Sequence, residues 1–231
     1  MPVISTATVV LAAAQAVSFA TKDGWSISAK YRPAAAGKAT IVLAHGVASA
    51  GGEWGRLTET LASKGIGSLS LDLRGHADSA RGPSGPTDYS GFDARGQWPS
   101  AAEDLRAAAA WLKKKGVPDG RIAFGGASIG ANLASIVAAE RPSTPFLLLL
   151  SPSENYRGVF LKTRAGLKTL AAASPADSYA YVCVRRLEAE KRAAVVYAPG
   201  GHGVQMFEDA ETFKRLTGWI ASASAAPAPS K

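Results

Sequence analysis

A serine flanked by two glycines is the residue best placed for chemistry in this sequence. Gly126, Ser128 and Gly130 form a Gly-x-Ser-x-Gly pentapeptide, and small residues two positions either side of the serine permit a tight turn. A strand-like apolar run over 121–125 precedes it, and a helical periodicity over 128–139 follows it. The serine would stand at a helix N-terminus, where backbone N–H groups and the helix dipole favour developing negative charge. This context predicts a nucleophile.

A serine hydroxyl becomes a useful nucleophile only when a base removes its proton and a third group orients that base. His202 lies in a glycine-rich loop directly after the last expected strand, which favours it as the base over His45 and His76. On a fold of this kind the acid stands between serine and histidine in chain order, and Asp177 meets that order. Asp177 also has the position of a helix N-cap, a purely structural role. Both roles stay open at this stage.

Attack on a carbonyl also requires hydrogen-bond donors for the oxygen that becomes negative. The backbone N–H of Ile129, next to the serine, is one expected donor, and that of Val47, after the strand-like run 40–44, is the other. Large side chains on or near expected strand-end loops are candidates for the pocket wall, and each is equally compatible with a place in the core or in loop packing. They are Trp54, Phe92, Trp98, Tyr156 and Met206.

Strand-like and helix-like runs alternate along the chain and have to position these groups. Strands are expected at 16–20, 25–31, 40–44, 66–71, 121–125, 146–150, 168–173 and 193–198. Helices are expected at 53–63, 100–115, 128–139, 177–190 and 205–222. Ser100 and Glu103 have capping-box spacing, and 76–98 is read as a long loop. The pattern predicts an α/β fold: a mostly parallel sheet with helices on both faces and an antiparallel hairpin at the N-terminal edge.

Length and composition favour one domain. A chain of 231 residues that is 47% hydrophobic supports one sizeable core, which we place at 16–222, with an N-terminal extension at 1–15 and a tail at 223–231. The extension contains an apolar stretch that resembles a short signal peptide, but residues 1–21 hold no Lys or Arg. A cytoplasmic location is slightly favoured over export. The stretch is too short and too polar for a transmembrane helix.

Charge and motifs narrow the function classes. The net charge of +8 comes from scattered basic residues, and Lys113 to Lys115, the tight run, falls at a helix end, so nucleic acid is not an expected partner. Net charge would still attract anionic substrates weakly. No ligand-spaced cluster predicts a metal, and no glycine-rich phosphate loop after the first strand predicts a nucleotide cofactor. Cys183, the single cysteine, is expected to pack rather than react.

These motifs together resemble the α/β-hydrolase superfamily, and within it the small, lid-poor, dienelactone-hydrolase-like serine hydrolases. The residues that carry the resemblance, over about 16–220, are His45-Gly46-Val47, Asp72-Leu-Arg-Gly-His76, Gly126-Ala-Ser128-Ile-Gly130, Asp177 and Gly201-His202-Gly203. The resemblance implies an eight-stranded sheet and a Ser128–Asp177–His202 triad with no cofactor. It also implies that His45 and the 72–76 segment are largely structural.

The sequence departs from the family at several points. Dienelactone hydrolases proper have a cysteine where this chain has Ser128, which points to ordinary ester chemistry. The frequent Arg-Gly-His-Gly-x-Ser pattern reads Arg-Gly-His-Ala-Asp-Ser over 74–79, so the start of the following loop has its own shape. The segment 151–167 is too short for the helical cap that many relatives insert, which implies an open site for fairly bulky esters.

The leading hypothesis is therefore a carboxylic-ester hydrolase that acts on a small-molecule ester through an acyl-enzyme. Two other classes stay open. A peptidase or amidase would use the same triad with better protonation of the leaving group. A non-catalytic member of the fold would serve as a binding module.

Overall fold

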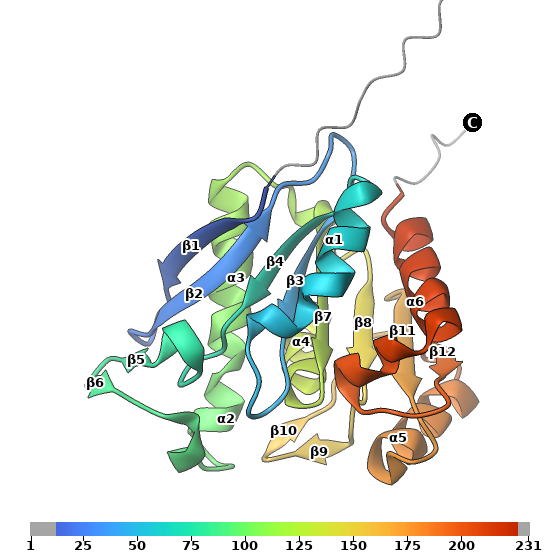
Figure 1. Ribbon diagram of the computed structural model, residues 1–231. Helices are drawn as coiled ribbons and strands as arrows, with labels where there is room; N and C mark the ends of the chain where they lie inside the picture. Colours follow the sequence, from blue (N-terminus) through green and yellow to red (C-terminus); the bar gives the residue numbers. More distant parts are fainter. Residues whose placement is uncertain (1–12, 226–231) are drawn as a thin grey trace, which may run out of the picture.

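The structure is a computed structural model that describes residues 13–225. Most of the N-terminal extension and most of the expected tail lie outside these residues. The main sheet has eight strands in the order β1-β2-β4-β3-β7-β8-β11-β12 (Figure 1). Their bounds are β1 Gln15–Ala20, β2 Ser26–Arg32, β3 Thr40–Ala44, β4 Gly67–Leu71, β7 Ile122–Ala127, β8 Leu147–Leu150, β11 Thr169–Ala173 and β12 Ala194–Tyr197. The expected α/β architecture is confirmed.

Within the main sheet, neighbouring strands in the run β4-β3-β7-β8-β11-β12 are parallel. The first two strands, β1 and β2, form the antiparallel hairpin at the edge. β2 also pairs antiparallel with β4, so the hairpin extends the parallel sheet. The central strands are buried along their whole length, as parallel strands covered on both faces must be. Their carboxyl ends meet at one edge, which is where the candidate groups follow in the chain.

Helices cover both faces of the sheet (Figure 1). The helices are α1 Gly55–Ser63, α2 Gln97–Ser100, α3 Ala102–Lys114, α4 Ile129–Ala139, α5 Ser178–Ala189 and α6 Ala210–Ala223. α1 and α6 pack on one face and α3, α4 and α5 on the other, and each face has its own apolar cluster. Along β3, Ile41 and Leu43 face the cluster under α1 and α6, while Val42 and Ala44 face the cluster under α3, α4 and α5. This is the alternation that a pleated strand imposes.

Two sequence predictions at helix ends are wrong. Ser100 does not cap the long helix, because it closes the short α2, and α3 follows after Ala101 with no side-chain cap. The last expected helix is divided. A 3₁₀ helix over Gly203–Glu208 comes first, and the Asp209 carboxylate then accepts from the Thr212 N–H to start α6.

The expected loop over 76–98 contains short elements. These are 3₁₀ helices at Ala77–Ser79 and Tyr89–Gly91, the two-residue strands β5 Arg81–Gly82 and β6 Gly85–Pro86, and the start of α2. The remaining 3₁₀ helices are Gly51–Trp54 and Asp119–Arg121. Between β8 and β11 the chain forms a small hairpin of β9 Asn155–Tyr156 and β10 Val159–Phe160. No large cap domain covers the described part of the molecule. None of its helices combines the length and the apolar character needed to cross a bilayer.

A buried charge cluster joins three parts of the fold. Arg74, in the turn after β4, is 2% exposed and donates from Nε to Asp104 of α3 at 2.8 Å. Its Nη1 donates to Asp23 of the β1–β2 turn at 2.6 Å, and its guanidinium lies 5.2 Å from the ring centre of Trp25. The Arg74 N–H also donates to Asp104. The cluster therefore fixes the turn after β4 against both α3 and the edge hairpin.

Candidate active site

Ser128 sits at a sharp turn between β7 and α4. Its backbone has φ 55° and ψ −123°, a conformation that costs a non-glycine residue about 1–3 kcal/mol and occurs where the surrounding structure imposes it. Here the Ser128 N–H donates to the Leu150 carbonyl of β8 at 2.9 Å. The turn lifts the side chain above the carboxyl ends of the strands.

The two glycines of the pentapeptide are required by close backbone contacts. A Cβ on Gly126 would lie 2.1 Å from the Gly130 carbonyl oxygen, and a Cβ on Gly130 would lie 2.1 Å from that of Ala44. Both distances are shorter than any real Cβ contact. Glycine at these positions lets α4 start against the end of β3, and this brings Ser128 beside the loop that follows β3.

His202 and Asp177 are in direct contact. The His202 Nδ1 and the Asp177 Oδ2 are 2.7 Å apart, with the aspartate side chain 16% exposed and the histidine 50% exposed. Because a carboxylate only accepts, Nδ1 carries the hydrogen, and Nε2 is the nitrogen left to take a proton. Asp177 stands at the N-cap of α5, but its side chain does not cap the helix. Of the two roles left open for Asp177, the contact favours the one that orients the histidine.

Two cavities meet at Ser128. The first, about 300 Å³, is lined from the loop after β3 and from the loop after β12, and its residues include Val47, Glu53 and Gln205. The second, about 270 Å³ and mainly apolar, is lined from the β9–β10 hairpin and the start of α5, including Tyr179. Both are lined by Ser128, Tyr156 and His202. The serine and the histidine thus face the same space, although they lie 74 positions apart in the chain.

The positions of the expected oxyanion donors suit that role. Val47 lines the first cavity, and a Cβ on its neighbour Gly46 would lie 3.4 Å from the Ser128 Cβ. The loop after β3 therefore passes directly beside the serine. Ile129 is the first residue of α4, and the N–H of a first helical residue has no partner within its helix. Both backbone N–H groups remain predicted donors.

Two carboxylates hold the loop after β3: Glu53, which the sequence did not single out, and Asp72, which belongs to the 72–76 segment expected to be structural. Glu53 accepts from the Gly46 N–H at 3.3 Å through one oxygen and from the Ser49 hydroxyl through the other. Asp72 accepts from the Gly51 N–H at 2.8 Å. Burial raises the pKa of Glu53, against the opposing hydrogen bonds from Ser49 and Gly46. Glu53 also lines the first cavity, a fact that no motif reveals because it depends on how the loop folds back.

The other two histidines are buried and hydrogen-bonded to backbone. The Leu73 N–H donates to His45 Nε2 at 2.9 Å, which leaves Nδ1 to donate to the Gly46 carbonyl at 2.7 Å. Burial lowers the pKa of His45 to about 4, so the ring is neutral at neutral pH. His76 stacks on Tyr89 with ring centres 4.0 Å apart, and burial lowers its pKa as well. Their positions fit the structural role that the resemblance implied.

Four of the five predicted pocket residues line neither cavity. Trp54 and Met206 are fully buried in the cluster under α1 and α6, while Phe92 and Trp98 pack in the cluster on the other face. Each side chain faces inward from a segment that ends near the site, so closeness in sequence to a strand end was misleading. Tyr156 does line both cavities.

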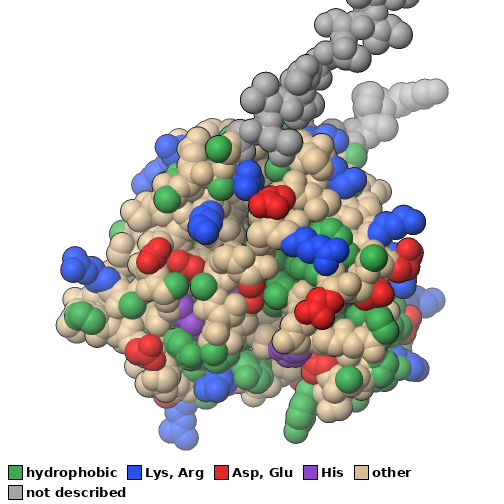
Figure 2. All heavy atoms as spheres, viewed as in Figure 1, with side chains coloured by type: hydrophobic (Ala, Val, Ile, Leu, Met, Phe, Trp, Pro, Cys, Tyr) green, Lys and Arg blue, Asp and Glu red, His purple; other side chains and the backbone are tan. Residues whose placement is uncertain are grey.

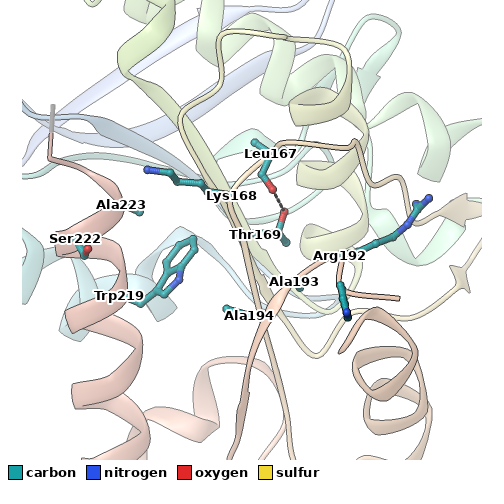
Figure 3. Close-up of a pocket in the computed structure, with 10 residues that line it drawn as sticks. Leu167, Lys168, Thr169, Arg192, Ala193, Ala194, Trp219, Ser222 and Ala223 are labelled. Carbon is teal, nitrogen blue, oxygen red and sulfur yellow. Dashed lines mark hydrogen bonds between the residues drawn. The ribbon is translucent and has the colours of Figure 1, made fainter. Parts of the chain in front are cut away.

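A third cavity lies away from Ser128. It has about 410 Å³ and is lined from the starts of β11 and β12 and from the end of α6, with Trp219 on its wall (Figure 3). It contains no residue of the Ser128 site. Among residues 13–225, no group of three or more His, Cys, Asp or Glu side chains is arranged to hold a metal ion. Cys183 is buried, and burial raises its pKa to about 12, which keeps it a thiol.

Comparisons with known proteins agree with the fold. The family described as "Serine aminopeptidase, S33" matches residues 35–176, which include Ser128. Comparison with curated proteins gave no match.

Solved structures show the same fold at low identity. A "predicted CIB-like hydrolase" of Thermoplasma acidophilum is 20% identical, with a TM-score of 0.69 over 91% of this chain and 99% of the other. The carboxylesterase EstE1, cloned from a metagenomic library, is 19% identical, with a TM-score of 0.68 over 94% and 91%. The esterase Pf2001 of Pyrococcus furiosus is 16% identical, with a TM-score of 0.69 over 93% and 94%.

Proposed function

Because the chain belongs to the family described as serine aminopeptidase, S33, within the α/β-hydrolase superfamily, we propose that it is a serine hydrolase that cleaves carboxylic esters. The observation that carries the proposal is the contact between His202 and Asp177, at a place where the histidine and Ser128 line the same two cavities. Acyl transfer requires a serine, a histidine and a carboxylate that act together beside an open space, and we propose these three residues for that role.

In the proposed reaction, His202 Nε2 takes the proton of the Ser128 hydroxyl as the oxygen attacks the ester carbonyl carbon. The backbone N–H groups of Val47 and Ile129 stabilise the negative oxygen, a contribution typically worth about 10²–10³ in rate for each donor. The tetrahedral intermediate then expels the alcohol, which takes the proton from His202. Asp177 holds the imidazole in its reactive tautomer throughout. Water, activated by the same histidine, hydrolyses the acyl-enzyme and restores the serine.

One observation favours an ester over an amide: solved structures with this fold include proteins named as esterases. The mainly apolar cavity next to Ser128 would take one organic substituent of the ester, with Tyr156 and Tyr179 as its walls. A peptidase activity is the second candidate, favoured by the name of the matched family.

The test compares a short-chain nitrophenyl ester with the corresponding nitroanilide in wild type, Ser128→Ala and Ser143→Ala. Ser143 is exposed and lies outside both cavities, so its variant is the matched control. We expect ester turnover in wild type and the control, and a fall of about 10³-fold or more in Ser128→Ala. Preferential cleavage of the nitroanilide would assign an amidase. Absence of both turnover and fluorophosphonate labelling in folded wild type would refute the triad and leave a binding module.

A further inference from the structure

We propose that Glu53 makes the site selective for substrate charge, favouring esters with a cationic group beside this carboxylate and rejecting esters with an anionic group there. The inference rests on the proposed ester hydrolysis and narrows its substrate class. Glu53 would act as a specificity-determining residue of the first cavity, which it lines together with Ser128 and His202.

The hydrogen bonds of Glu53 match those of an ionised carboxylate. One oxygen accepts from a backbone N–H, of Gly46, and the other accepts from a hydroxyl, of Ser49. A carboxylate has about four lone-pair sites, so two remain for a ligand after these bonds are made. The same bonds fix the carboxylate in place, and a group held in advance pays less to bind a ligand.

The charges around the two cavities are the opposite of those of the whole chain. The sequence carries 26 Lys and Arg against 18 Asp and Glu, yet no Lys or Arg is among the residues that line either cavity. The charged side chains there are Glu53 and Asp177, and Asp177 is bonded to His202. Arg157 lies 5.7 Å from the ring centre of Tyr156 and lines neither cavity. Glu53 is thus the carboxylate in this space without a charged partner in direct contact.

Burial strengthens the effect of this charge. Burial raises the pKa of Glu53, which means that the carboxyl is partly withdrawn from water. Interactions between charges are screened less at such a position than at the surface. The half-buried carboxylate of Glu53 therefore determines which substrate charges are favoured in the first cavity. The net charge of +8, in contrast, is spread over a surface where basic and acidic side chains are mixed (Figure 2).

The experiment uses matched esters whose far end is a trimethylammonium, a tert-butyl or a carboxylate group, placed on the acyl part in one series and on the alcohol part in a second. In at least one series we expect wild type to prefer the cationic ester over the neutral one by about tenfold in kcat/KM, and the neutral over the anionic by a similar factor. In Glu53→Gln both ratios should approach one. Because ratios are compared within each variant, a general loss of rate cancels.

Glu59→Gln is the control, since Glu59 is exposed on α1 and lines neither cavity while its loss changes the net charge equally. It should keep the wild-type ratios. Should Glu53→Gln fail to fold, raising the salt concentration with wild type provides the test, because the cation preference must then shrink. Ser128-dependent cleavage with no charge preference in either series would overturn this inference alone. No Ser128-dependent cleavage of any ester would instead refute the proposed function.

Discussion

At the residue scale, the environment of each histidine distinguishes rings that the sequence makes similar. His45, His76 and His202 all follow strands that end at the same edge of the sheet. His45 and His76 are almost fully buried, and both ring nitrogens of His45 and the Nδ1 of His76 contact backbone atoms. His202 is half exposed and bonded to Asp177, so it alone of the three combines access to a substrate with an orienting carboxylate.

The buried His45 predicts a specific loss of stability in acid. Its pKa is about 4 in the folded protein against 6.5 in the unfolded chain, so between these values the unfolded state binds a proton that the native state does not. The contribution of the neutral His45 to the free energy of unfolding is therefore fully present above pH 6.5 and is lost as the pH falls toward 4. We expect the free energy of unfolding of wild type to drop by about 3 kcal/mol more than that of His45→Gln between pH 7.5 and pH 4.

Urea unfolding of both proteins at the two pH values measures this difference. Titrating groups that do not contact His45 are present in both proteins and cancel in the comparison. Parallel loss of stability in wild type and His45→Gln would show that His45 is not held neutral in the fold.

Sequence reasoning proposed Ser128 and His202 from short glycine-containing motifs at strand ends, and Asp177 from its place between them in chain order. It did not reach Glu53, and it misplaced Trp54, because neither motif nor periodicity tells which side chain of a loop turns toward a cavity. Glu53 and Trp54 are neighbours in one 3₁₀ helix, yet one lines the site and the other is fully buried. Which of the two side chains faces the cavity depends on how the loop packs against the sheet.

At the element scale, the contact between α4 and β3 is what places the serine beside the expected oxyanion loop. The eight strands of the main sheet were predictable to within one or two residues, and for its parallel strands the reason is that buried parallel strands are continuous apolar runs. The two-residue strands β5, β6, β9 and β10 were not predicted. Helix starts were harder to predict. Ser100 belongs to the short α2, and the residue whose side chain caps α6 is Asp209.

We expect Gly130→Ala to lower both stability and activity. The new Cβ would meet the Ala44 carbonyl oxygen at 2.1 Å and the His45 carbonyl oxygen at 2.6 Å, so α4 must move away from β3. The free energy of unfolding should fall by about 3 kcal/mol, and a shift of the serine by 1 Å from the loop donors would cost about 10²-fold in kcat. Urea unfolding and ester turnover measure the two effects.

Gly218→Ala is the matched control for this change. Gly218 is exposed on α6, and nothing lies within 4 Å of the position of its Cβ. An alanine there should stabilise the protein by about 0.5–1 kcal/mol and leave turnover unchanged. If Gly130→Ala behaved like Gly218→Ala, the close approach of α4 to β3 would not be what fixes the site.

At the scale of the whole molecule, the Arg74 cluster connects three separate parts of the chain through buried charges. Asp23, Arg74 and Asp104 come from the edge hairpin, the turn after β4 and α3. Burial raises the pKa of Asp104 to about 6 even beside Arg74, which shows how costly it is to desolvate this carboxylate. A buried pair of this kind adds little net stability compared with apolar packing, but removing one partner leaves the other charge exposed to the full penalty.

Asp104→Asn therefore tests how the layers are held together. We expect it to lower the free energy of unfolding by about 3 kcal/mol, because Arg74 stays 2% exposed with less compensating charge. Asp23→Asn removes the same charge from a side chain that is 39% exposed, and solvent screening should limit its cost to about 1 kcal/mol or less. Urea unfolding of wild type and both variants measures the two losses in the free energy of unfolding. Equal and small losses would mean that water reaches Arg74, and that the edge hairpin and α3 are joined by apolar packing alone.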